Sequence, residues 1–253
     1  MKFKRVRALL KNTGYLIKGY SRRFSKAKVE EEVHKGMNEM VRYTMPVVNR
    51  PELGEKNRNR IHNMRLCCDL IDNIHLKPGT VFSLEKIIGE PSPARGFKVG
   101  PVIVDGTRTD GYGGGICQIS TLLFNVALQG NLKILEKHNH SSDIWGEKRM
   151  VDLGRDAAYV YLLKDLKFTN DSLSEMVLKL KLDEDKREIT GIMKTHSPSI
   201  ENDVMIETAV LEENTIKRNG NGSVTAAKGW VIRTRRVLRH TGNVTYEKIE
   251  TYR

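Results

Sequence analysis

The spacing of apolar residues predicts helices in the first half of the chain. Two segments, 57–74 and 116–128, place their apolar side chains on one helical stripe. The stripes are formed by Ile61, Met64, Cys68 and Ile71 and by Ile119, Leu122, Leu123 and Val126. A third helix is expected over 30–43. It should end before Pro46, because a proline restricts the backbone of the residue that precedes it.

Strand patterns become dominant toward the C-terminus. Two short strands are expected early, at 80–83 and 99–104. From residue 157 onward, alternating apolar and polar positions predict strands at 159–163, 176–182, 204–211, 230–238 and 244–249. Thr241-Gly242-Asn243 suits a hairpin turn between the last two. This order predicts an α+β fold, with a helix-bearing core that contains Cys117 followed by mainly antiparallel β-strands.

The same patterns divide the chain into three parts. Residues 1–44 are expected to form a basic amphipathic tail, residues 45–175 a core domain, and residues 176–253 a β-rich region that can pack on the core. The chain has 253 residues, which suits one or two domains.

Positive charge is concentrated in the tail. The chain carries 43 Lys+Arg against 31 Asp+Glu, for a formal net charge of +12. Ten of the basic residues and no acidic residue lie within 1–28, so the remaining residues have a balance of only +2. A basic body that reads nucleic acid is therefore not expected, and no nucleic-acid partner is predicted.

Residues 1–28 also have an amphipathic pattern. Apolar or weakly polar residues recur every three or four positions: Phe3, Val6, Leu10, Thr13, Ile17, Tyr20 and Phe24. A helix of this kind suits an anionic membrane surface, and a solvated arm is the alternative. Lys11 and Lys18 interrupt the apolar run that a secretory signal needs, and no stretch is apolar enough to span a membrane. The expected location is cytoplasmic or peripheral at the inner face of the membrane.

The segment around Cys117 carries the strongest chemical signal. Gly113, Gly114 and Gly115 allow the backbone to approach a ligand closely. Cys117 follows in the first turn of the predicted helix, where free N–H groups and the helix dipole favour a thiolate. The same N–H groups, with the Gln118 side chain, could hold an oxyanion during acyl transfer through a thioester. The alternative is a buried cysteine that only packs.

A nucleophilic thiol needs a base, and two histidines follow the predicted helix. His138 and His140 lie two positions apart, so one of them can reach Cys117, with Asp143 or Asp156 orienting the imidazole. Arg95 and Arg155 are candidates for binding a substrate carboxylate, and surface ion pairs are the alternative for both.

A zinc site from Cys117, His138 and His140 is a further alternative, but the sequence offers no evident fourth ligand. No metal and no cofactor are therefore expected.

Four segments resemble the VanW family, which is named for an accessory protein of glycopeptide-resistance clusters. They are 77–83 (KPGTVFS), 113–125 (GGGICQISTLLFN), 138–141 (HNHS) and 153–157 (LGRDA). The resemblance covers roughly 57–170. It implies a peptidoglycan setting, because some VanW-domain proteins are understood to act as L,D-transpeptidases that take an acyl group from one stem peptide and pass it to the amine of another.

Carried over to this sequence, the resemblance implies specific roles. Cys117 would be the nucleophile, and His138 or His140 the general base. Gly114, Gly115 and the amide of Cys117 would be the oxyanion donors. The expected function is a cysteine acyltransferase that acts on peptidoglycan stem peptides or precursors. The alternatives are a non-catalytic resistance or cell-wall accessory protein at the inner membrane surface and a zinc-dependent hydrolase.

Overall fold

The structure is a computed structural model that describes residues 23–104, 107–143, 146, 149–197, 203–220 and 223–253. The expected amphipathic helix in 1–28 falls almost wholly outside these residues. Among the described residues, no helix combines the length and the apolar character needed to cross a membrane.

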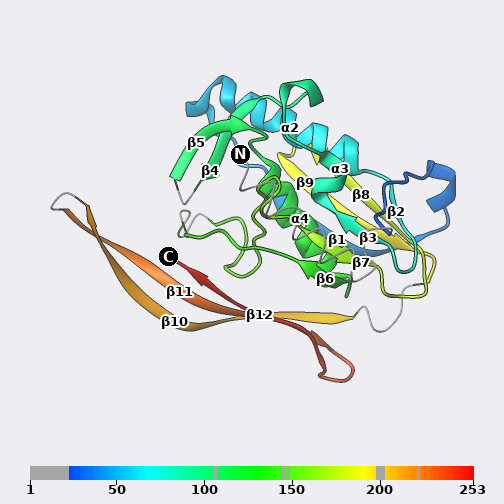
Figure 1. Ribbon diagram of the computed structural model, residues 1–253. Helices are drawn as coiled ribbons and strands as arrows, with labels where there is room; N and C mark the ends of the chain where they lie inside the picture. The colour runs from blue at the N-terminus through cyan, green and yellow to red at the C-terminus, as the bar shows by residue number, and fades with distance from the viewer. Residues whose placement is uncertain (1–22, 105–106, 144–145, 147–148, 198–202, 221–222) are drawn as a thin grey trace.

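The core is built on a four-stranded antiparallel sheet with the order β1-β9-β8-β2 (Figure 1). The strands are β1 (Asn38–Pro46), β2 (Ile74–Leu76), β8 (Met176–Asp183) and β9 (Glu188–Thr195). Helices α2 (Glu55–Ile71) and α4 (Ile116–Gln129) contact each other, and α2 packs on β8 while α4 packs on β1 and β9. The sequence places a boundary between residues 175 and 176, with β2 before it and β8 after it. These two strands pair in the same sheet.

Two smaller sheets surround this core. One has the order β3-β7-β6 and consists of β3 (Val81–Ser83), β6 (Lys133–Glu136) and β7 (Lys167–Thr169). The other is the hairpin of β4 (Val99–Val104) and β5 (Thr107–Tyr112), which packs on α2 through β4. The short helix α3 (Leu84–Ile88) and the 3-10 turns η2 (Glu31–His34), η3 (Pro51–Leu53) and η4 (Pro93–Arg95) complete this part.

The last three strands form a separate sheet with the order β10-β11-β12 (Figure 1). They are β10 (Val204–Gly220), β11 (Ser223–Leu238) and β12 (Val244–Tyr252). One face meets the core, and it buries Ile232, Thr234 and Tyr252. Arg236 on the same face donates to the carbonyl oxygens of Leu128 and Leu132, at 3.2 and 2.9 Å, and so caps the C-terminal end of α4.

The predicted α+β class is confirmed, but two predicted elements are wrong. Residues 38–46 form strand β1 and not a helix, because pairing with β9 buries Val41 and Met45 against the core. The strand predicted at 159–163 is a turn, in which Leu162 has a positive φ of 65°. The other predicted helices and strands are present, and β10 and β11 are longer than expected.

Candidate active site

The glycine segment forms a tight loop that leads into α4. Gly113 and Gly115 have φ angles of +86° and +101°, which favour glycine. A Cβ on Gly114 would lie 2.8 Å from the carbonyl oxygen of Pro101 in β4, so the loop backbone packs directly on that strand. Since α4 begins at Ile116, Cys117 is its second residue, where backbone N–H groups lack helical partners.

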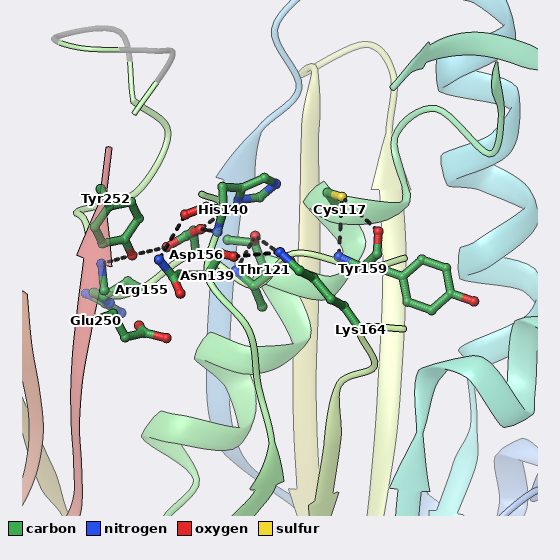
Figure 2. A network of polar contacts seen from close by, with 12 residues as sticks. Cys117, Thr121, Asn139, His140, Arg155, Asp156, Tyr159, Lys164, Glu250 and Tyr252 are labelled. Carbon is green, nitrogen blue, oxygen red and sulfur yellow. Dashed lines mark hydrogen bonds and ion pairs between the residues drawn. The ribbon is translucent and has the colours of Figure 1, made fainter. Parts of the chain in front are cut away.

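The thiol of Cys117 lies against the backbone of Tyr159. The Tyr159 amide donates to Sγ at 3.4 Å, and the thiol approaches the Tyr159 carbonyl oxygen at 3.6 Å (Figure 2). Burial alone would raise the pKa of Cys117, but a hydrogen bond with His140 and the charge of that imidazole bring the pKa below its usual value. The other two cysteines differ, because burial raises the pKa of Cys67 and raises the pKa of Cys68 to about 12.

The His140 ring points toward Cys117, and its other side is held by a carboxylate (Figure 2). Its Nδ1 donates to Oδ2 of Asp156 at 2.6 Å, and its backbone amide donates to the same oxygen at 2.8 Å. Burial opposes the charged imidazole, yet hydrogen bonds with Asp156 and Cys117 raise the pKa of His140 to about 10. Cys117, His140 and Asp156 therefore favour a thiolate–imidazolium pair oriented by a carboxylate.

Strand β12 holds Asp156 from the other side. The Tyr252 hydroxyl donates to Oδ1 of Asp156 at 2.5 Å and accepts from the Gly154 amide at 2.7 Å (Figure 2). Glu250 on the same strand forms a buried ion pair with Lys137, which directly follows β6. Burial would raise the pKa of Asp156, but the hydrogen bond from His140 and the charge of Lys137 lower it to about 2. Tyr252 is not among the site residues predicted from the sequence, because no sequence pattern links it to Cys117.

The other histidine and aspartate candidates have different partners. His138 contacts Oε1 of Glu136 at 2.9 Å, and its side chain is 38% exposed against 20% for His140. Asp143 accepts from the Arg149 guanidinium and from the Gly146 amide. The structure thus brings His140 and Asp156, and not His138 and Asp143, to Cys117.

Three further candidates make contacts within the fold. The Gln118 side chain donates to the Pro46 carbonyl oxygen at 2.7 Å and accepts from Arg60 at 3.2 Å. Arg95 donates to the carbonyl oxygen of Ile88 at 2.8 Å, at the end of α3. Arg155 donates to Asn125 on α4 at 2.8 Å, and its guanidinium lies over the Tyr43 ring. The two arginines are not among the residues that line the cavity beside Cys117.

That cavity has a volume of about 450 Å³. The glycine loop, strands β4 and β5, residues 140–143 and 149–153 and the turn at Tyr159 contribute to its walls, and Cys117, His140 and Asp156 all line it. Four arginines also line it, none of which the sequence reasoning singled out: Arg50, Arg60, Arg108 and Arg149. Within the described part of the chain, no three His, Cys, Asp or Glu side chains are grouped to hold a metal ion.

Part of the chain is similar to known proteins. Vancomycin B-type resistance protein VanW of Enterococcus faecalis is 30% identical over 129 residues, which are 51% of this chain and 47% of that protein. The uncharacterized protein YoaR of Bacillus subtilis is 33% identical over 125 residues, which are 49% of this chain and 40% of that protein. The chain thus spans less than half the length of these relatives, and no solved structure matches it. Residues 59–192 match the family described as VanW like protein, and the chain therefore belongs to the VanW family.

Proposed function

We propose that this protein is an L,D-transpeptidase-like cysteine acyltransferase that acts on peptidoglycan stem peptides through a thioester on Cys117. The observation that carries the proposal is that Cys117 and His140 line one cavity, where His140 lowers the pKa of the thiol while Asp156 holds the imidazole at 2.6 Å. A buried cysteine that only packs needs no such partners. Cys67 and Cys68, whose pKa values burial raises, illustrate that alternative within the same chain.

The reaction begins with attack of the Cys117 thiolate on a peptide carbonyl carbon. The resulting oxyanion would be stabilised by the backbone N–H groups of Gly114, Gly115 and Cys117. The C–N bond then breaks, and the His140 imidazolium gives its proton to the departing amine. Asp156 holds Nδ1, so Nε2 is the nitrogen that transfers the proton.

The second half returns the enzyme to its starting state. The amine of a second stem peptide attacks the thioester carbonyl, and neutral His140 accepts the proton that this amine loses. The C–S bond breaks, which releases the Cys117 thiolate and leaves a new amide between the two peptides. No oxidant, metal or nucleotide is needed for this balance.

The VanW relative is named for vancomycin B-type resistance, and we extend that setting to this protein as part of the proposal. A role in the cell wall is compatible with a cavity of about 450 Å³, which is large enough for a short peptide segment. We also propose that residues 1–28 bind anionic membrane surfaces through their ten basic residues. Cosedimentation with anionic and neutral vesicles tests this, and equal binding to both would contradict it.

The decisive experiment incubates purified protein with disaccharide-tetrapeptide muropeptides and follows the products by mass spectrometry. We expect a cross-linked dimer or an acyl adduct on Cys117, and neither should form with Cys117→Ala. Cys68→Ala is the matched control, because it removes a thiol outside the cavity lining. A folded wild-type protein that gives no adduct and no product would favour a non-catalytic accessory protein, and product formation by Cys117→Ala would exclude the thiol mechanism.

A further inference from the structure

The cavity beside Cys117 contains a cluster of three arginines that the proposed chemistry does not use. Arg50 lies just before η3, Arg60 lies on α2, and Arg108 lies on β5. We call Arg50, Arg60 and Arg108 the arginine cluster. They come from three separate elements, so only the tertiary structure brings them to one cavity.

The β4–β5 hairpin is fixed on α2, which brings Arg108 to the cluster. Lys56 on α2 forms an ion pair with Asp110 on β5 at 2.5 Å, and Asn59 donates to the Val99 carbonyl oxygen at 2.9 Å. Gly100 completes the contact, because a Cβ there would lie 3.5 Å from the Lys56 carbonyl oxygen. The hairpin therefore holds Arg108 at the cavity wall, with its side chain exposed.

The three cations are close enough to affect one another. Burial lowers the pKa of Arg50, and the charge of Arg108 lowers it further, while the charge of Glu52 acts in the opposite direction. Burial and then the charge of Arg50 lower the pKa of Arg60 to about 10. Like charges gathered at a partly buried surface repel one another, and an anion bound among them would relieve that repulsion.

The described acidic residues that line the same cavity are Glu90, Asp143, Asp152 and Asp156, and two of them are engaged with other groups. Asp143 pairs with Arg149, and Asp156 holds His140 and Tyr252. These two carboxylates therefore serve other cations and hydroxyls, while Glu90, Asp152 and the charge of Glu52 near Arg50 offset part of the positive charge that the arginines bring to the wall.

Arg60 connects the arginine cluster to the glycine loop. A Cβ on Gly115 would lie 3.0 Å from the Arg60 carbonyl oxygen and 3.2 Å from its Cγ, so the two residues pack directly. The Arg60 guanidinium donates to Gln118 and, at 2.5 Å, to the Val48 carbonyl oxygen, while its buried Nε has no partner in the structure. This rigid cation therefore lies directly behind the loop that precedes Cys117.

We propose that the arginine cluster binds the free carboxylate at the end of a peptide substrate. When the scissile carbonyl of the substrate lies at Cys117, the free carboxylate belongs to the residue that departs. The Cα of that residue is about 3.8 Å from the Cα of the residue that is acylated. A planar guanidinium matches a carboxylate in charge and in shape. The cluster would thus restrict cleavage to the last amide bond of a peptide. This inference rests on the proposed function, because it deepens the substrate choice of the same site.

The test compares a stem tetrapeptide that ends in a carboxylate with the same peptide ending in a carboxamide. We expect the wild-type protein to favour the carboxylate form by about 100-fold in kcat/KM. Arg108→Gln and Arg50→Gln should each lower kcat/KM for the carboxylate form by about 10- to 100-fold and leave the carboxamide form unchanged. Arg58→Gln is the control, because Arg58 is exposed on α2 and lies outside the cavity lining. Equal losses for both peptides, or no loss for either, would overturn the inference.

A binding measurement separates this inference from the proposed function. Calorimetry with Cys117→Ala and the same two peptides requires no turnover. Carboxylate-selective binding that Arg108→Gln weakens would support the arginine cluster even if no acyl transfer were found. Acyl transfer by the wild-type protein without any preference for the carboxylate form would overturn the arginine cluster and leave the proposed function standing.

Discussion

The family-matched core and the C-terminal sheet are organised in different ways. In the core, α4 and the strands beneath it bury nearly every side chain of the helix, including Leu122 and Phe124. Among the residues of the β10–β12 sheet whose burial is described, one face packs on the core, and the exposed apolar residues include Val244 and Ile249. Yet this sheet supplies Tyr252 to the carboxylate that holds His140. The candidate site is therefore completed by an element outside residues 59–192, the part matched by the family.

The largest expected effect lies within the core and separates its two histidines. His140→Ala should lower acyl transfer by about 1000-fold or more, because it removes the group that activates the Cys117 thiol. His138→Ala should stay within about threefold, since its imidazole contacts Glu136 and not the thiol. Initial rates with muropeptides measure both. A loss for His138→Ala as large as that for His140→Ala would contradict this assignment.

Asp156, the carboxylate that holds His140, should set the pH dependence of acyl transfer. The Cys117 pKa is lowered and the His140 pKa is raised to about 10, and both shifts favour a thiolate beside an imidazolium. Activity should therefore be lost at high pH as His140 loses its proton near 10. Asp156→Asn removes the carboxylate that raises the His140 pKa, so the upper limb of the profile should move down by at least about one pH unit. Profiles of kcat/KM test this, and an unchanged upper limb in Asp156→Asn would refute it.

The C-terminal sheet should affect the rate of acyl transfer through Tyr252, which contacts Asp156. Tyr252→Phe removes the hydroxyl that donates to Asp156 at 2.5 Å, and acyl transfer should fall about tenfold, with the rate loss equivalent to about 1.4 kcal/mol. Tyr246→Phe on the same strand is the matched control, because the buried Tyr246 hydroxyl has no hydrogen-bond partner in the structure.

The high-pH limb of the kcat/KM profile should be measured together with the rate in both tyrosine variants. If Tyr252 positions Asp156, its loss should shift that limb, and the loss of the Tyr246 hydroxyl should not. Equal rates and profiles for the two variants would mean that the sheet contributes only stability.

The smallest effect is expected on the outer face of the sheet. Arg235 pairs with Glu247 across β11 and β12, and both side chains are partly exposed. Arg235→Ala should change the free energy of unfolding by less than about 1 kcal/mol and leave acyl transfer unaltered. Denaturant unfolding measures the first quantity. A loss of activity would show that the outer face is also coupled to the site.

The local patterns of the sequence determined much of the core. The stripe of Ile119, Leu122 and Val126 predicts α4, and the preceding glycines predict its start, so the place of Cys117 in the first turn follows from neighbouring residues alone. The alternation after 203 likewise predicts β10, β11 and β12, and the Thr-Gly-Asn turn predicts the connection between the last two. These features depend on periodicity over a few residues, which the sequence records directly.

Contacts between distant segments decided the rest. Residues 38–46 form a strand because they pair with β9, which lies far along the chain. This pairing outweighs the local helical pattern. The choice of His140 over His138 and of Asp156 over Asp143 could not be read from spacing, because 137–140 is irregular and the two imidazoles reach different carboxylates. Tyr252 and the arginine cluster likewise meet the site only after the chain has folded. The sequence by itself thus determined which thiol sits at a helix start, whereas the tertiary structure decided which groups surround it, because their contacts join residues that share no local pattern.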